Sequence, residues 1–196
     1  MFNVNFHFAT FNLLAPLGIS YYALSLIGYT LDVYRGTSEP QKNILKHTLF
    51  TCYYPVMISG PIVRYNEMKE ELFTPKEYNF KNVLFGAERI VYGLLKKMVI
   101  ADQLGIVVNA IFSQYNIYSG IYLVIGVIFY AIQIYTDFSG CMDIVIGASK
   151  MYGVVLPENF KSPFFSRNLS EFWRKWHITL GTWAKDYIMY PLLKSE

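Results

Sequence analysis

The sequence predicts an all-α integral membrane protein, a polytopic bundle of about four to six membrane-embedded helices, some of them broken or re-entrant. Of its 196 residues, 54% are hydrophobic and 18% aromatic, whereas only 16% are charged. A soluble domain usually carries about 25% charged residues, so this composition favours contact with lipid. Two stretches, residues 8–31 and 103–136, contain no charged residue, and each can cross a hydrocarbon core of about 30 Å.

The first of these stretches is predicted to kink or split at Pro16 and Gly18. A second apolar stretch, residues 48–63, is short for a membrane span and contains two prolines and a glycine. A broken or re-entrant helix therefore fits it better than a straight one. Irregular backbone of this kind is tolerated at membrane depth only where protein or a water-filled cavity surrounds it.

The most polar part of the chain, residues 64–81, is predicted to form a surface loop with a short amphipathic helix near residues 67–73. Residues 83–100 have a helical pattern that four charged side chains interrupt. The pair Lys96-Lys97 is the densest basic site, and it favours a cytoplasmic position.

The polar patch at residues 113–120 divides the second charge-free stretch into a short helix and a clear span at about residues 118–134. A further helical segment is expected at residues 141–155. Gly140 and Gly147 lie one heptad apart, a spacing that allows two helices to pack closely.

A loop is predicted at residues 157–168, followed by a capping box of Asn168 and Glu171 that opens a helix running towards Pro191. The chain shows neither an internal repeat nor a change in composition that would mark a domain boundary. Residues 1–196 are therefore expected to form a single membrane-embedded segment.

Several other classes of protein are not indicated. The net charge of +3 is too small to predict a nucleic-acid partner. Cys52 and Cys141 lie in apolar contexts, without the spacing of a metal site or a disulfide framework. No Lys or Arg precedes the first apolar stretch, so a secretory signal is not predicted.

His177 is the candidate base. On a continuous helix, Trp173, Arg174 and Gly181 would share its face, and the glycine would leave space beside the imidazole for a substrate. A histidine can take a proton from a hydroxyl group, as acyl transfer to an alcohol requires. The alternative is a histidine that packs between helices and is hydrogen-bonded across the bundle.

Basic side chains flank this histidine. Arg174, Lys175 and Lys185 could hold an anionic donor or polymer, or they could extend to lipid headgroups. Asp137 lies at the end of an apolar span, where pairing with an arginine or capping a helix is expected. Asp143 falls on another helical face, so a paired-carboxylate site is not predicted.

Several longer motifs occur in order along almost the whole chain. They are SLIGYTLDVYRG (residues 25–36), SGPIVRY (59–65), YTDFSG (135–140), LPENF (156–160), EFWRKWHITL (171–180), TWAKDY (182–187) and YPL (190–192). Together they closely resemble the membrane-bound O-acyltransferase family, in its bacterial alginate O-acetylation branch. The valine in Gly60-Pro-Ile-Val-Arg-Tyr65 also differs from the aspartate of the branch that transfers D-alanine to teichoic acid.

The resemblance implies a membrane enzyme, located in the bacterial cytoplasmic membrane, that transfers an acyl group to a hydroxyl, often on an exported polymer. His177 matches an active-site histidine of the family. Asp137, Arg174, Trp176 and Asp186 match positions that shape the site. No bound cofactor or metal is implied, and acetyl-CoA or another activated acyl carrier would act as co-substrate.

Family members are more than twice as long and carry a second histidine downstream, whereas no histidine follows His177 here. The resemblance therefore implies a central portion of an enzyme, without the N-terminal helices. Membrane lipid, a polysaccharide or envelope polymer, and a periplasmic or extracellular acyl-transfer protein are the expected partners. Three alternatives remain: D-alanyl transfer to teichoic acid, a non-enzymatic component of polymer export, and a truncated, inactive remnant.

Overall fold

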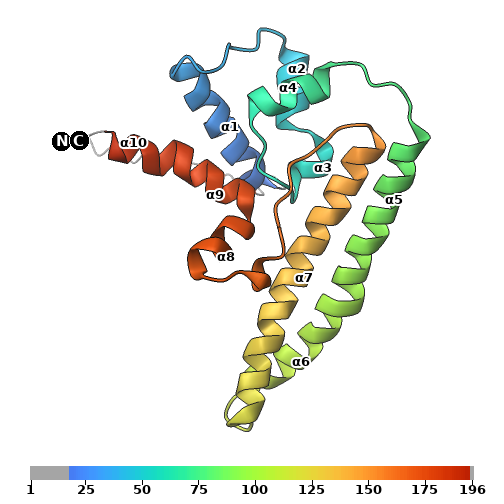
Figure 1. The fold of residues 1–196 in the computed structure, drawn as a ribbon, viewed down its shortest axis with the longest axis vertical. Coiled ribbons are helices and arrows are strands. Elements are labelled where there is room, and N and C mark those ends of the chain that lie inside the picture. The colour runs from blue at the N-terminus through green and yellow to red at the C-terminus, as the bar shows by residue number, and fades with distance from the viewer. Residues whose placement is uncertain (1–17, 195–196) are drawn as a thin grey trace, which may run out of the picture.

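The structure, a computed structural model, describes residues 18–194, and these residues form helices and connecting segments without a strand. A long arm of two antiparallel helical rods adjoins a group of shorter helices (Figure 1). The arm comprises α5 (Phe80–Leu94), η1 (Leu95–Ala101), α6 (Asp102–Ser113) and α7 (Ile121–Met151). The shorter group comprises α1 (Ile19–Tyr34), α2 (Ile44–Thr51), α3 (Tyr54–Met57), α4 (Tyr65–Phe73), η2 (Pro163–Phe165), α8 (Leu169–Lys175), α9 (Ile178–Ala184), η3 (Lys185–Met189) and α10 (Tyr190–Leu193).

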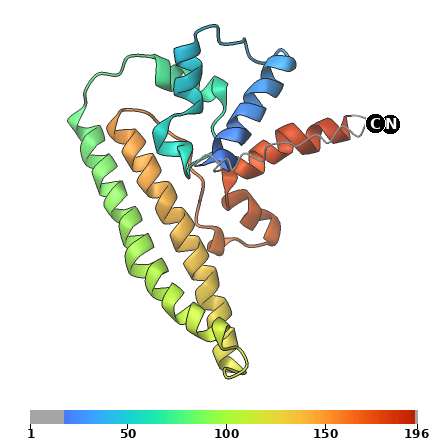
Figure 2. The same ribbon diagram turned by 180° about the vertical axis from the view of Figure 1, so that it is seen from behind.

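The two rods of the arm contact each other through glycines. A Cβ atom added at Gly93 would lie 2.6 Å from the carbonyl oxygen of Gly140, and one added at Gly140 would lie 2.8 Å from that of Gly93. Gly86 and Gly147 repeat this reciprocal contact one heptad away, at 2.6 and 2.7 Å. The close packing predicted from the spacing of Gly140 and Gly147 is therefore confirmed, and the rods lie side by side in both views (Figures 1 and 2).

The sequence-based prediction of two helical segments, at residues 118–134 and 141–155, is wrong. The polar patch does end α6 at Ser113, but α7 then continues unbroken from Ile121 to Met151. Two residues between the predicted segments contact the opposite rod: Asp137 forms an ion pair with Lys97 of η1, and Gly140 packs against the backbone of Gly93.

Other predicted elements agree with the structure. The apolar stretch at residues 48–63 is broken, because α2 ends at Thr51 and α3 is a single turn before an extended segment. The amphipathic helix expected near residues 67–73 is α4. The helix expected at residues 83–100 is α5 together with the π-helical η1.

One helix within residues 18–194, α7, is long and apolar enough to cross a membrane by length and composition, and only 11% of its most apolar window is buried by the rest of the chain. The first predicted span begins outside the described residues. Its second half is α1, which starts after Gly18, a residue with a left-handed φ of 74°. Pro16 also lies outside the described residues.

Two apolar clusters organise the shorter helices, and the larger of them also connects these helices to the arm. In the larger, Met142 and Ile146 of α7 pack with Phe50 of α2 and with Tyr65 and Met68 of α4. The smaller cluster is formed by the buried side chains of Ile62, Trp183 and Tyr187, against which α1 also packs. This smaller cluster packs α9 and η3 against α1, and it thereby fixes the position of His177, which precedes α9.

Candidate functional site

The helix predicted to run from Asn168 towards Pro191 is interrupted at His177. Asn168 caps α8 as expected, since its Oδ1 accepts a hydrogen bond from the backbone N–H of Glu171 at 2.8 Å. The helix then ends at Lys175, Trp176 is extended, and His177 adopts a left-handed conformation with φ of 45° as the N-cap of α9. A single continuous helix through His177 is therefore a wrong prediction.

The interruption has a tertiary cause, the segment that contains Asn159. The backbone N–H of Ile178 donates to the carbonyl oxygen of Asn159 at 3.0 Å, and that of Lys161 donates to the carbonyl oxygen of Lys175 at 3.0 Å. These bonds hold the backbone in an extended conformation beside residues 159–161. A non-glycine residue with positive φ is costly, and this pairing maintains it at His177.

The side chain of Asn159 is fully buried and lies at the centre of the site. Its Oδ1 lies 3.1 Å from Nδ1 of His177, 3.1 Å from the backbone nitrogen of Thr179 and 3.0 Å from Oγ1 of Thr179. The Thr179 hydroxyl in turn accepts a hydrogen bond from the backbone N–H of Ile62 at 3.0 Å. Asn159 therefore joins the start of α9 to the histidine and to the segment before α4.

His177 lines a cavity of about 790 Å³ between α8 and α9. Gly181 also lines it, with open space where a Cβ atom would be, as expected from the sequence. Arg174 and Lys185 bring two positive charges to a lining that contains no carboxylate from residues 18–194. The remaining lining residues are mostly apolar: Ser170, Trp173, Trp176, Ile178, Leu180, Thr182 and Ala184.

Burial lowers the pKa of His177 below its ordinary value of about 6.5. The imidazole is half-buried, and its ring lies edge-on to Phe138 of α7 at a centroid distance of 4.8 Å. A neutral imidazole can accept a proton, whereas an imidazolium cannot. His177 is therefore in its base form at neutral pH.

Trp176 holds the cavity wall in place. Its indole stacks on Phe172 at 5.5 Å and 18°, and it contacts Phe160 edge-on at 5.2 Å. Tyr135 of α7 lies 6.0 Å from the same indole. This aromatic cluster fixes α8 against the arm.

The other residues selected from the sequence lie outside the lining of this cavity. Lys175 forms an ion pair with Glu171, at 2.7 Å between Nζ and Oε1. Asp137 pairs with a lysine of the opposite rod, as described above, in the middle of α7 rather than at its end. Asp186 pairs with Arg64, and its backbone carbonyl accepts a hydrogen bond from Arg35.

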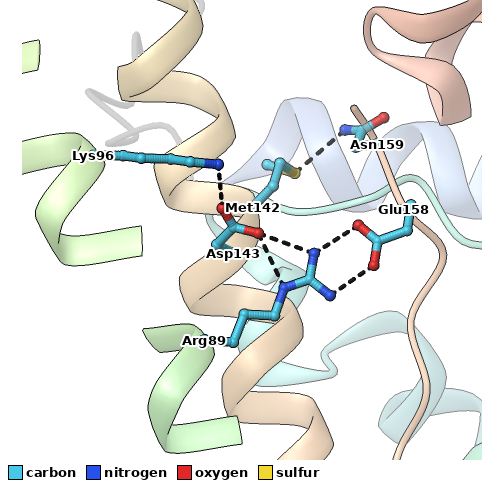
Figure 3. A network of polar contacts seen from close by, with 6 residues as sticks. All are labelled: Arg89, Lys96, Met142, Asp143, Glu158 and Asn159. Atoms are coloured by element: carbon cyan, nitrogen blue, oxygen red, sulfur yellow. Dashed lines mark hydrogen bonds and ion pairs between the residues drawn. The ribbon is translucent and has the colours of Figure 1, made fainter. Parts of the chain in front are cut away.

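A charged network beside Asn159 was not singled out from the sequence. Asp143 accepts ion pairs from Lys96 at 2.7 Å and from Arg89 at 2.9 Å, and Arg89 also binds both carboxylate oxygens of Glu158 at 2.6 Å (Figure 3). The Asp143 side chain is only 12% exposed. The network thus ties the residue preceding Asn159 to both rods of the arm.

Asn159 was part of a quoted motif, but nothing in the sequence assigned it a role. The one sequence feature that could have indicated a role is its amide side chain, which can both donate and accept hydrogen bonds, within the proline-containing motif Leu156-Pro-Glu-Asn-Phe160. Within residues 18–194, no three His, Cys, Asp or Glu side chains lie close enough together to hold a metal ion. The lining side chains that can take part in acid–base or charge interactions at this cavity are the imidazole of His177 and the cations Arg174 and Lys185.

These features define a class, an all-helical protein that has, within residues 18–194, one helix able to span a membrane and a neutral histidine at the wall of a mostly apolar cavity. The family model of the membrane-bound O-acyltransferases matches residues 42–196. The chain belongs to this family, as its motifs indicated.

Relatives with curated descriptions are consistent with this membership. The chain is 38% identical over 181 residues to a probable alginate O-acetylase of Pseudomonas syringae pv. tomato, a match that covers 92% of this chain and 35% of the relative. It is 33% identical to a peptidoglycan O-acetyltransferase of Helicobacter pylori, covering 95% of the chain and 40% of the relative. A teichoic acid D-alanyltransferase of Bacillus subtilis is 29% identical, covering 93% and 47%. The chain thus spans between about a third and a half of the length of these relatives.

Proposed function

We propose that this chain is the part of a membrane O-acyltransferase that carries a catalytic base, and that the enzyme acetylates hydroxyl groups of an exported or cell-envelope polysaccharide. The family membership and the alginate and peptidoglycan relatives support both the reaction class and the polymer acceptor. Identity to the D-alanyl transferase is lower, at 29% against 38%, which favours acetyl over D-alanyl transfer.

The single observation that carries the proposal is the position of His177 at the wall of the 790 Å³ cavity. The mostly apolar lining favours displacement of water by a bound substrate, and water would otherwise compete with the acceptor for the acyl group. The open space at Gly181 leaves room for a substrate beside the imidazole. Arg174 and Lys185 supply positive charge, which suits an anionic acyl carrier such as acetyl-CoA.

In the proposed reaction, the imidazole of His177 removes the proton from an acceptor hydroxyl as its oxygen attacks the acyl carbonyl carbon. A carbon–oxygen bond forms, and the bond between the carbonyl carbon and the carrier breaks. The imidazolium then returns the proton to the departing carrier, so the base is regenerated. The low pKa of His177 favours the neutral form with which the cycle begins.

We also propose that the protein crosses the bacterial cytoplasmic membrane more than once. The α5–η1–α6 rod runs antiparallel to α7, the candidate span, and its basic side chains pair with acidic side chains of α7. Charges that pair within the bundle are the form in which ionisable groups persist at membrane depth. An acyl-transfer partner protein outside the cytoplasm is compatible with this arrangement.

The test is H177A in the full-length protein, expressed in cells that make the acceptor polymer. Loss of a general base is expected to lower the rate of O-acetylation by about 100-fold to 10,000-fold, while the amount of protein in the membrane stays unchanged. The matched control is H47A, because His47 contacts Tyr29 and lies outside the cavity lining.

The readout is the O-acetyl content of purified polymer, normalised to the polymer secreted. If H177A left acetylation at the level of H47A, the assignment of the base would be wrong. If H177A abolished polymer secretion instead, a component of polymer export would fit better than an acyltransferase.

A further inference from the structure

The hydrogen bonds around Asn159 determine which of its side-chain atoms is the oxygen. The backbone N–H of Thr179 can only donate, and it points at the Asn159 side-chain atom 3.1 Å away. The Thr179 hydroxyl accepts from Ile62 N–H and is free to donate its own hydrogen to the same atom. The atom must therefore be the carbonyl oxygen Oδ1, and the amide nitrogen points to the sulfur of Met142 (Figure 3).

An oxygen at this position also determines the protonation of the histidine. Nδ1 of His177 lies 3.1 Å from Oδ1 of Asn159, and a carbonyl oxygen can only accept a hydrogen bond. Nδ1 must therefore carry a hydrogen. In a neutral imidazole, the other nitrogen, Nε2, then has a free lone pair.

We propose that Asn159 is a positioning residue for acyl transfer, which holds His177 in the Nδ1–H tautomer so that Nε2 is the atom that removes the proton of the acceptor hydroxyl. This inference rests on the proposed function of His177 as the base. Asn159 also replaces a local cap for α9: His177 makes no side-chain capping bond, and Oδ1 of Asn159 accepts the bond from Thr179 N–H instead. Oδ1 of Asn159 thus stabilises the start of α9, which orients the imidazole, and it also determines which nitrogen of the imidazole carries the hydrogen.

The first test compares two substitutions of Asn159 in the full-length protein. In N159L the side chain keeps the branching of asparagine at Cγ but has no acceptor, so the tautomer is no longer fixed, and polymer acetylation is expected to fall by about tenfold or more. In N159D the carboxylate accepts the same hydrogen bonds and restores activity. It also places a negative charge beside the ring, which is expected to move the acid limb of the pH–rate profile up by about one to three units.

If Asn159 had only a structural role, N159D would restore activity, but the acid limb of its pH–rate profile would not move. The control is T179V, which removes the hydroxyl that bridges Asn159 and Ile62 but leaves the bond to Nδ1. T179V is expected to lower thermal stability without moving the acid limb. The cavity groups that titrate beside His177 within residues 18–194 are the cations Arg174 and Lys185, and none of the three variants alters them.

The tautomer itself can be observed by ¹⁵N NMR of histidine-labelled full-length protein in detergent, with the His177 signals assigned by their loss in H177Q. The expected spectrum has a protonated Nδ1 and an unprotonated Nε2 in the neutral form. A signal from a protonated Nε2 would overturn the inference, and it would do so even if N159L failed to enter the membrane.

The two proposals fail in different ways. If acetylation survives in H177A, His177 is not the base, and the proposed role of its tautomer is overturned as well. Loss of acetylation in H177A, together with a wild-type rate and acid limb in N159L, leaves the base in place and overturns only the role of Asn159.

Discussion

Replacing Gly140 by alanine tests whether the two long rods are held together by contact between their backbones. The added Cβ atom would lie 2.8 Å from the carbonyl oxygen of Gly93 and 3.2 Å from Cβ of Lys96. The carbonyl belongs to the backbone of α5 and cannot rotate away, so one rod must shift. Overpacking of this kind typically costs about 1–3 kcal/mol.

The matched control is G181A, since a Cβ atom at Gly181 meets nothing within 4 Å. Both glycines lie within α-helices, so both variants gain the helix propensity of alanine, about 1 kcal/mol. The difference between the two variants therefore isolates the packing term of about 1–3 kcal/mol. Thermal unfolding of the full-length protein in detergent is the assay, and G140A is expected to unfold at a lower temperature than G181A.

A double variant makes the test more specific. Gly93 and Gly140 form one reciprocal contact, so once the rods have moved apart for one Cβ atom, the second should cost less. The destabilisation of G93A/G140A is therefore expected to be smaller than the sum of the single effects, as for residues that share a contact. An unfolding temperature of G140A equal to that of G181A would refute the reasoning.

Two further predictions concern charged groups. D143N is expected to destabilise the arm by about 3–5 kcal/mol, because it leaves the mostly buried Lys96 without its carboxylate partner, while Arg89 keeps its pair with Glu158. The control D102N, on the exposed surface, should change stability by less than about 0.5 kcal/mol. Unfolding of both variants in detergent measures this difference. The backbone N–H of Val155 donates a hydrogen bond to the Glu71 carboxylate and lowers its pKa below the ordinary value of 4.5. The ionised carboxylate therefore stabilises the folded state at pH values above 4.5. The stability difference between wild type and E71Q should therefore be full at neutral pH and shrink as the pH falls below 4.5, and an unchanged difference at pH 3.5 would contradict it.

Local patterns in the sequence were sufficient for much of the arm. Apolar composition and the polar patch at residues 113–120 located α6 and the start of α7, and the heptad spacing of Gly140 and Gly147 indicated a close helix contact. These features could be recognised because helix formation and close packing depend on residues three to seven positions apart.

The continuity of α7 could not be predicted in this way. Asp137 and Gly140 are unfavourable in an apolar helix when each is considered alone. Their partners, Lys97 and Gly93, lie 40 and 47 residues earlier in the chain, respectively. Only the packing of the two rods shows that both residues are compensated.

The sequence by itself determined the helical class, the family, and His177 as the candidate base. The tertiary structure decided how that histidine is presented. Asn159 lies eighteen residues before His177, yet its backbone carbonyl and its side-chain oxygen break the predicted helix and contact Nδ1 of the ring. A hydrogen bond between separate segments overrides local helix propensity because a buried amide must be paired. The spacing of residues within either segment does not show that these two segments must be hydrogen-bonded to each other.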